Sequence, residues 1–162
     1  MAKIKIVVSV INPIGCPSSN RPIPPPVGDY FDFTEDVVLK RYKKKRPGHG
    51  LPTHQADRLA GIHSGTVTLL RITGPGDRFY KPGIYVYQYV ATYKFKNLAK
   101  TPLKKGQITG HGLALFDSTT ETLFELPIRY AITGGTDVYA KARGKILELH
   151  NATNDRELYI EL

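Results

Sequence analysis

Residues 130–144 constrain the fold of this chain more than any other stretch. An apolar run that ends near Thr133 is followed by Gly134 and Gly135, a short spacer, and a second run that begins after Gly144. Glycine adopts positive φ angles easily and lets two backbones approach closely, whereas a Cβ atom hinders both. The pattern therefore predicts a strand, a tight glycine turn and a second strand.

Strand-like segments recur along the whole chain. Runs rich in Val, Ile, Thr, Tyr and Phe are bounded in most cases by Gly, Pro, Asn or Asp, and no window sustains a long helical period. The predicted strands cover residues 3–11, 30–39, 57–73, 83–96, 106–117, 122–133, 142–150 and 156–161. Such a set of short strands closes most simply into an all-β, up-and-down antiparallel barrel of about eight strands, whose interior packs shut or holds one small ligand.

The chain is predicted to form one domain over residues 1–162, because this length can bury a single compact core. Residues 12–27 contain six prolines, which cannot donate a ladder hydrogen bond, so this segment is predicted to be a loop that could act as a lid. The single cysteine, Cys16, excludes an intramolecular disulfide. No apolar run reaches the roughly 18 residues that a membrane span needs. The N-terminal run is also too short for a secretory signal, so a cytoplasmic protein without a membrane partner is expected.

The formal net charge of +9 is concentrated in two segments. Six lysines and arginines lie within residues 40–46 and five lysines within residues 94–105, in each case around a predicted loop or turn. Three interpretations are open: a hydrated loop face, attraction of an anionic ligand or acidic partner, and nucleic-acid binding. Because charge at loops stays hydrated, the first is favoured and no nucleic-acid partner is predicted.

Five short motifs occur in the order in which they appear in a known group of barrels. They are residues 28–36, 63–71, 89–93, 106–112 and 130–144. Together they resemble segments of allene oxide cyclases and dirigent proteins, and the resemblance covers roughly residues 28–150. It implies a small β-barrel without a cofactor that steers a reactive hydrophobic intermediate to one stereoisomer. It also implies a homo-oligomer, with a trimer expected.

The predicted strand at residues 83–96 places its aromatic residues on one face. Alternation puts four tyrosines on the same face as Ala91 and Phe95, and this face is expected to point inward. The four are Tyr85, Tyr87, Tyr89 and Tyr93. A buried hydroxyl without a partner costs about 1–3 kcal/mol, so one interpretation is ordinary packing with every hydroxyl hydrogen-bonded or at the rim. The other is an aromatic wall that supports a flat, unsaturated ligand.

Glu35 is a charged residue on an otherwise apolar strand face. It shares that face with Phe33 and Val37, so an inward orientation would desolvate the carboxyl group, as suits a general acid or base. Arg71 and Arg129 are the candidate partners, because an interior arginine needs a carboxylate. One interpretation is a salt bridge that closes an end of the barrel. The other is a site that handles a proton or holds an anion.

The family comparison narrows the chemistry that can be expected. In allene oxide cyclases, five positions hold the substrate, and only one of them, Asn12, carries the family residue in this chain. The five positions are Val10, Asn12, Glu35, Val67 and Ala114. The allene oxide reaction itself is therefore not expected. Dirigent proteins use aspartates, tyrosines and an arginine, and the resemblance offers Asp36, Tyr87 or Tyr89, and Arg129 for these roles.

These residues together form the predicted site. The predicted catalytic residues are Glu35, Arg71 and Arg129, and the predicted substrate-binding residues are Asn12, Phe33, Val67, Tyr85, Tyr87, Tyr89 and Ala114. No metal is expected, because the five histidines show no metal-ligand spacing and are interpreted as solvated.

Two classes of function follow. The first is a cofactor-independent cyclase or isomerase of secondary metabolism, in which the barrel constrains a flexible hydrophobic substrate and a few polar groups act on it. The second is a dirigent-like binding protein with no bond-making residues of its own. An interior pocket with Glu35 buried and paired favours the first class, whereas a filled or purely apolar barrel favours the second.

Overall fold

The computed structural model describes residues 3–14, 24–43, 59–99, 101–120, 122–123, 127–149 and 155–162, with the backbone alone at 11–14, 41–43 and 122–123. Most of these residues belong to β-strands. The strands are β1 (Lys3–Ile14), β2 (Tyr30–Lys43), β3 (Leu59–Ile72), β4 (Ile84–Phe95), β5 (Gly106–Asp117), β6 (Thr122–Leu123), β7 (Ile128–Gly135), β8 (Arg143–Glu148) and β9 (Asp155–Glu161). A short 3₁₀ helix, η2 (Asp137–Tyr139), lies between β7 and β8.

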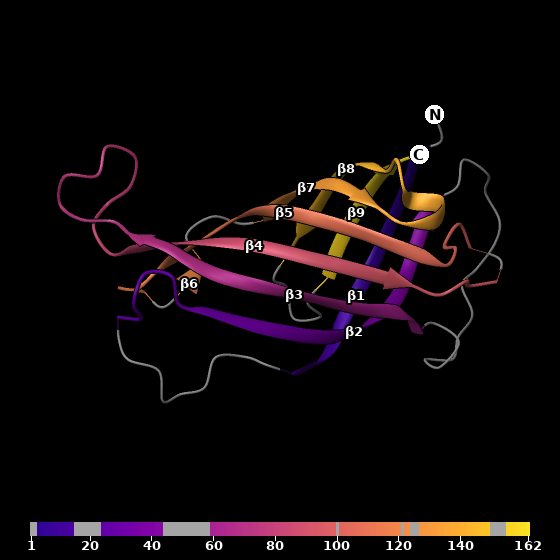
Figure 1. Cartoon of the computed structure of the whole chain (residues 1–162), viewed down its shortest axis with the longest axis horizontal. Helices are drawn as coiled ribbons and strands as arrows, with labels where there is room; N and C mark the ends of the chain where they lie inside the picture. The colour runs from indigo at the N-terminus through magenta and orange to yellow at the C-terminus, as the bar shows by residue number, and fades with distance from the viewer. Residues whose placement is uncertain are drawn as a thin grey trace.

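Eight of these strands form a closed antiparallel barrel (Figure 1). Each strand from β1 to β4 pairs with the next along the chain, and β5 then pairs with β7. The series continues through β8 and β9, and β9 pairs with β1 to close the ring. The two-residue strand β6 pairs with the end of β5. The predicted all-β, up-and-down barrel of about eight strands is confirmed.

One predicted strand is divided in the structure. The sequence predicts a single strand over residues 122–133, whereas the structure has the separate strands β6 and β7 there. Pro127 stands immediately before β7, and proline cannot donate the ladder hydrogen bond that a continuous strand needs. The proline-rich segment 12–27 lies largely outside the described residues, so its interpretation as a lid stays a prediction.

The glycine turn between β7 and β8 has the predicted character. Gly134 and Gly144 have φ angles of +149° and +133°, which residues with a side chain rarely adopt. A Cβ atom on Gly135 would lie 2.0 Å from the backbone carbonyl oxygen of Gln107 on β5. Glycine is therefore needed here both for its backbone angles and for a close approach of two strands.

The strand register sets which side chains meet inside the barrel. Glu35 on β2 lies opposite His63 on β3, and His63 lies opposite Tyr93 on β4. Side chains of residues that are directly opposite on neighbouring strands point to the same face of a sheet. His63 and Tyr93 are buried, so the row that they form with Glu35 faces the interior.

The interior is sealed in one part and partly accessible in another. The sealed part consists of apolar side chains that keep at most 1% exposure, among them Ile6, Leu39, Ile108, Leu158 and Ile160. A second group keeps 7–9% exposure: Phe33, Val67, Tyr85, Tyr89 and Ala114. Tyr85 stands at the start of β4, directly after the β3–β4 loop, which projects from the barrel end opposite η2 (Figure 1). The accessible part therefore extends toward the end that carries this loop.

Candidate active site in the barrel interior

A carboxyl–imidazole pair lies inside the barrel. Oε2 of Glu35 is 2.9 Å from Nδ1 of His63. The side chain of His63 has no exposed surface, whereas that of Glu35 keeps 15% exposure and so reaches accessible space. Burial lowers the pKa of His63 below its ordinary value of 6.5, although the hydrogen bond to Glu35 opposes the shift. The ring is therefore neutral at pH 7, and its Nδ1–H donates to the Glu35 carboxylate.

The lowered pKa of His63 predicts a pH-dependent stability. Below pH 6.5 the unfolded chain takes up a proton on this residue more readily than the folded chain does. The contribution of His63 to stability is thus fully present above pH 6.5 and is lost as the pH falls through the lower pKa of the folded state. Thermal unfolding followed from about pH 7.5 to about pH 5 should show a decline that His63→Gln reduces.

The matched control for this prediction is His111→Gln. His111 is exposed on the outer face of β5, where its Nε2 lies 2.9 Å from Nε2 of Gln88. Replacing His111 should leave the loss of stability at acid pH the same as in the wild-type chain. Equal slopes for the wild type and His63→Gln would contradict the neutral, buried state of His63.

Aromatic rings hold the imidazole in place. The His63 ring stacks on the Tyr93 ring with centroids 4.1 Å apart and planes at 18°. The Phe33 ring packs against it at 5.0 Å, and the Tyr89 ring lies at 6.3 Å. Gly65 leaves room for this packing, because a Cβ atom there would lie 2.9 Å from the Phe33 ring. The imidazole is therefore fixed between ring faces rather than free to rotate.

A second buried polar cluster lies on β7, β8 and β9. Nη2 of Arg156 is 2.8 Å from Oε1 of Glu148, and the Tyr130 hydroxyl donates to the other carboxylate oxygen at 2.7 Å. Burial raises the pKa of Tyr130 most, and the negative charge of Glu148 raises it further. The hydroxyl of Tyr130 therefore stays protonated and can donate. The Tyr130 ring stacks on Tyr89 at 4.6 Å, and Tyr89 also packs against Phe33 at 5.3 Å. Tyr89 thus connects the two clusters.

The stacked rings of His63 and Tyr93 each carry a buried polar atom that has no hydrogen-bond partner among the described residues. These atoms are Nε2 of His63 and the hydroxyl oxygen of Tyr93. Leaving a buried polar atom unpaired costs about 1–3 kcal/mol, so native proteins keep few of them. Burial raises the pKa of Tyr93, so its hydroxyl is neutral and can donate. The two stacked rings of His63 and Tyr93 therefore carry one acceptor nitrogen and one donor hydroxyl within the core.

Both arginines that were predicted to accompany Glu35 lie elsewhere. Arg71 is outside the barrel, where its Nη1 donates to Asp77 at 2.7 Å and half of its side chain is exposed. A shift of register between Leu69 and Arg71 causes this, because one inserted residue turns the following side chain to the other face. Arg129 is exposed on the outer face of β7, since its neighbour Tyr130 faces inward. The prediction of an interior Arg71 or Arg129 is wrong.

The predicted substrate-binding residues lie mostly on the accessible part of the interior. Those whose side chains are buried there are Phe33, Val67, Tyr85, Tyr89 and Ala114. Tyr87 is partly buried and packs against the same core. The side chain of Asn12 lies outside the described part of the chain, so the role implied for it stays a prediction.

Several interior polar residues were missed by the sequence analysis. Arg156 and Glu148 were overlooked, and His63 was wrongly interpreted as solvated. The alternation of inward and outward side chains along each strand could have identified these residues. Arg156, for example, shares its strand face with the apolar residues Leu158 and Ile160. Which of these residues meet is a matter of strand register, and a single strand pattern does not contain it.

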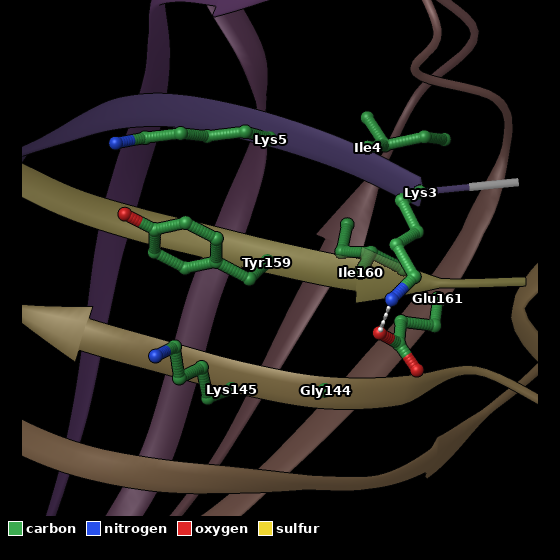
Figure 2. Close-up of a pocket in the computed structure, with 8 residues that line it drawn as sticks. All are labelled: Lys3, Ile4, Lys5, Gly144, Lys145, Tyr159, Ile160 and Glu161. Atoms are coloured by element: carbon green, nitrogen blue, oxygen red, sulfur yellow. Dashed lines mark ion pairs between the residues drawn. The ribbon is translucent and has the colours of Figure 1, made fainter.

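A surface groove of about 550 Å³ lies on the outside of β1, β8 and β9 (Figure 2). It is lined by Lys3, Ile4, Lys5, Gly144, Lys145, Tyr159, Ile160 and Glu161. Lys3 is 3.0 Å from Glu161, and the ammonium groups of Lys5 and Lys145 lie 4.8 and 5.1 Å from the centre of the Tyr159 ring. These charged groups interact with one another or with the Tyr159 ring at the surface. The Glu35–His63 pair inside the barrel is therefore the stronger candidate for chemistry.

No helix in the described part of the chain is long and apolar enough to cross a membrane. Within the same residues, no group of three or more His, Cys, Asp or Glu side chains is arranged to hold a metal ion.

Comparison with known proteins supports the fold. No protein-family model matches the chain, and no curated protein sequence matches it. Among solved structures, the chain is similar to pyocyanin demethylase, with a TM-score of 0.54 and 17% sequence identity over 99% of this chain and 100% of that one. At this identity the likeness shows that the two chains share a barrel fold.

Proposed function

We propose that this barrel binds a small, flat, hydrophobic molecule in its accessible interior and isomerises or cyclises it by moving a proton at Glu35. The observation that carries the proposal is the 2.9 Å bond between Glu35 and a fully buried His63, at the place where aromatic side chains meet accessible space. Glu35 is the catalytic residue, since it reaches that space. His63 is a positioning residue behind it.

The reaction class follows from the groups present. A C–H bond next to a carbonyl or another electron-withdrawing group breaks, and its proton passes to the Glu35 carboxylate. The electron pair enters the conjugated system of the substrate, and the proton returns to a different atom. Nothing is oxidised or reduced, so the residues of the chain suffice. His63 holds the carboxylate in one orientation through its Nδ1–H.

The aromatic wall suits a flat substrate. Phe33 and Tyr89 present rings that keep 8–9% exposure, unlike the sealed side chains of the core. Flat conjugated molecules gain both apolar burial and ring stacking against such faces. Val67 and Ala114 add small apolar surfaces beside them, so the substrate would lie between the rings with its acidic C–H group toward Glu35.

The dirigent-like alternative is a barrel that binds and orients its ligand without acting on it. One observation favours it: the rings of Tyr89 and Tyr130 stack on each other at 4.6 Å, which is the arrangement of ordinary aromatic packing. In this alternative the Glu35–His63 pair would stabilise the folded barrel and take no part in proton transfer.

Deuterium exchange on an aryl ketone separates the two functions. We expect the wild-type barrel to accelerate incorporation of deuterium at the α-carbon of α-tetralone in deuterated buffer, measured by NMR, above the rate in buffer alone. General-base catalysis typically contributes about 10²–10⁴-fold. The chain has ten tyrosines and no tryptophan, so quenching of tyrosine fluorescence reports binding of the same ketone in parallel.

Asp32→Asn is the matched control for the exchange assay. Asp32 lies on the same strand as Glu35 but on the outer face, where its carboxylate accepts from the Thr66 hydroxyl. This variant should exchange at the wild-type rate. Binding without accelerated exchange would overturn the isomerase and support the dirigent-like alternative, and the absence of both would overturn the two together.

A further inference from the structure

Among the described residues, the charges inside the barrel do not cancel. Glu35 and Glu148 are the carboxylates of the described interior, and Arg156 is its cation. Both oxygens of Glu148 are engaged, one by Arg156 and the other by the Tyr130 hydroxyl, so the positive charge is matched there. Burial opposes a charged guanidinium, yet the charge of Glu148 raises the pKa of Arg156, with a smaller contribution from Glu35.

Among the described residues, Glu35 is therefore the interior carboxylate without a cationic partner. Its hydrogen-bond partner is His63, whose ring is neutral because burial lowers its pKa. Like the carboxylate, Nε2 of His63 offers a lone pair, and it has no partner among the described residues. The 15% exposure of the Glu35 side chain shows that the charge borders accessible space. A ligand that enters this space meets the Glu35 carboxyl group inside the barrel, where electrostatic interactions are stronger than in open water.

The walls of this space add to the attraction of a cation. The Phe33 and Tyr89 rings lie beside His63 at this level of the barrel, and ring faces carry negative electrostatic potential. Proteins recognise organic cations with this combination of several aromatic faces and an acidic group. A neutral hydrocarbon of the same shape would gain the same apolar burial and would lack the electrostatic part.

We propose that the ligand of this barrel is a planar molecule with a delocalised positive charge, such as an N-alkylated heteroaromatic cation, seated against the Phe33 and Tyr89 rings with its charge beside Glu35. The inference deepens the proposed function and rests on its placing of the ligand in the accessible interior. A delocalised charge is weakly hydrated, so the ligand loses little on leaving water. Its positive charge also makes neighbouring C–H groups acidic, which suits proton transfer to Glu35.

A pair of isosteric probes tests the inference without knowledge of the natural ligand. N-methylquinolinium and α-methylnaphthalene have the same shape and electron count and differ in charge. We expect isothermal titration calorimetry of the wild-type chain to give a Kd for the cation that is at least about tenfold lower than for the hydrocarbon. Glu35→Gln should remove this preference and leave the affinity for the hydrocarbon unchanged, whereas Asp32→Asn should keep the preference.

Each outcome bears on the inference. Equal or tighter binding of the hydrocarbon by the wild type would overturn it, as would a cation preference that survives in Glu35→Gln, because the cation would then bind elsewhere, for example on the outer surface. Failure of both probes to bind would overturn it together with the proposed function. A cation preference without accelerated exchange on α-tetralone would leave the inference standing and would remove the proton transfer, so the two proposals can fail separately.

Discussion

Arg156→Met should lower the free energy of unfolding by about 3–5 kcal/mol, since it removes the buried guanidinium that is ion-paired with the buried carboxylate of Glu148. Arg156 and Glu148 are 4% and 3% exposed, and their ion pair measures 2.8 Å. The Tyr130 hydroxyl would still donate to that carboxylate after the change. Methionine keeps much of the length and apolar volume of the arginine, so the loss would be mainly electrostatic. Urea unfolding at neutral pH measures it as a shift of the midpoint at constant slope.

Arg129→Met provides the matched control for this prediction. It makes the same chemical change on the exposed outer face of β7, where surface substitutions typically alter stability by about 0.5 kcal/mol or less. The double variant Arg156→Met with Glu148→Gln should recover much of the loss, because it removes the unmatched charge. A loss for Arg156→Met no greater than that for Arg129→Met would show that the buried pair does not carry this energy.

Glu35→Gln should slow deuterium exchange on α-tetralone by about 10²–10⁴-fold relative to the wild type. Glutamine keeps the shape of the side chain, and its amide oxygen can still accept from the Nδ1–H of His63. What the variant lacks is a group able to take up the proton of the substrate. Fluorescence titration with the same ketone should show that the neutral probe still binds, so that the loss lies in the rate and not in binding.

Thermal unfolding provides the control for this second variant. Because the carboxyl group is partly exposed and its bond to His63 can be replaced by the amide, Glu35→Gln should remain folded at the temperature of the exchange assay. An exchange rate close to that of the wild type would show that Glu35 is not the base. It would leave His63, whose Nε2 has no partner among the described residues, as the group to examine next.

The sequence contained enough to predict the barrel. Alternating apolar residues mark each long strand, and the glycines of residues 130–144 mark the tight connection between β7 and β8. These signals are local, because a strand period and a positive φ angle depend on a few neighbouring residues. The division of residues 122–133 into β6 and β7 was not predicted, although Pro127 interrupts the strand pattern there. The trimer stays a prediction.

The site was predicted in part, and the reason lies in register. Glu35 was recognised because its own strand face is otherwise apolar. The tyrosines of β4 were recognised because alternation places them together on one strand face. The partner of Glu35 was assigned wrongly for two reasons. A bulge between Leu69 and Arg71 turns Arg71 outward. The sequence of one strand also does not reveal that His63 stands opposite Glu35. Pairings between strands depend on the assembled barrel, and one residue of slip reverses every face.

Proton exchange at the barrel interior is best tested by measuring α-tetralone exchange for the wild type, Glu35→Gln and Asp32→Asn at equal concentration in one deuterated buffer. The structure leads us to expect a rate above buffer for the wild type and for Asp32→Asn, and a rate near that of buffer for Glu35→Gln, since only Glu35 of the two carboxylates is bonded to the buried His63. Equal rates for all three proteins, whether fast or indistinguishable from buffer, would contradict proton transfer at Glu35.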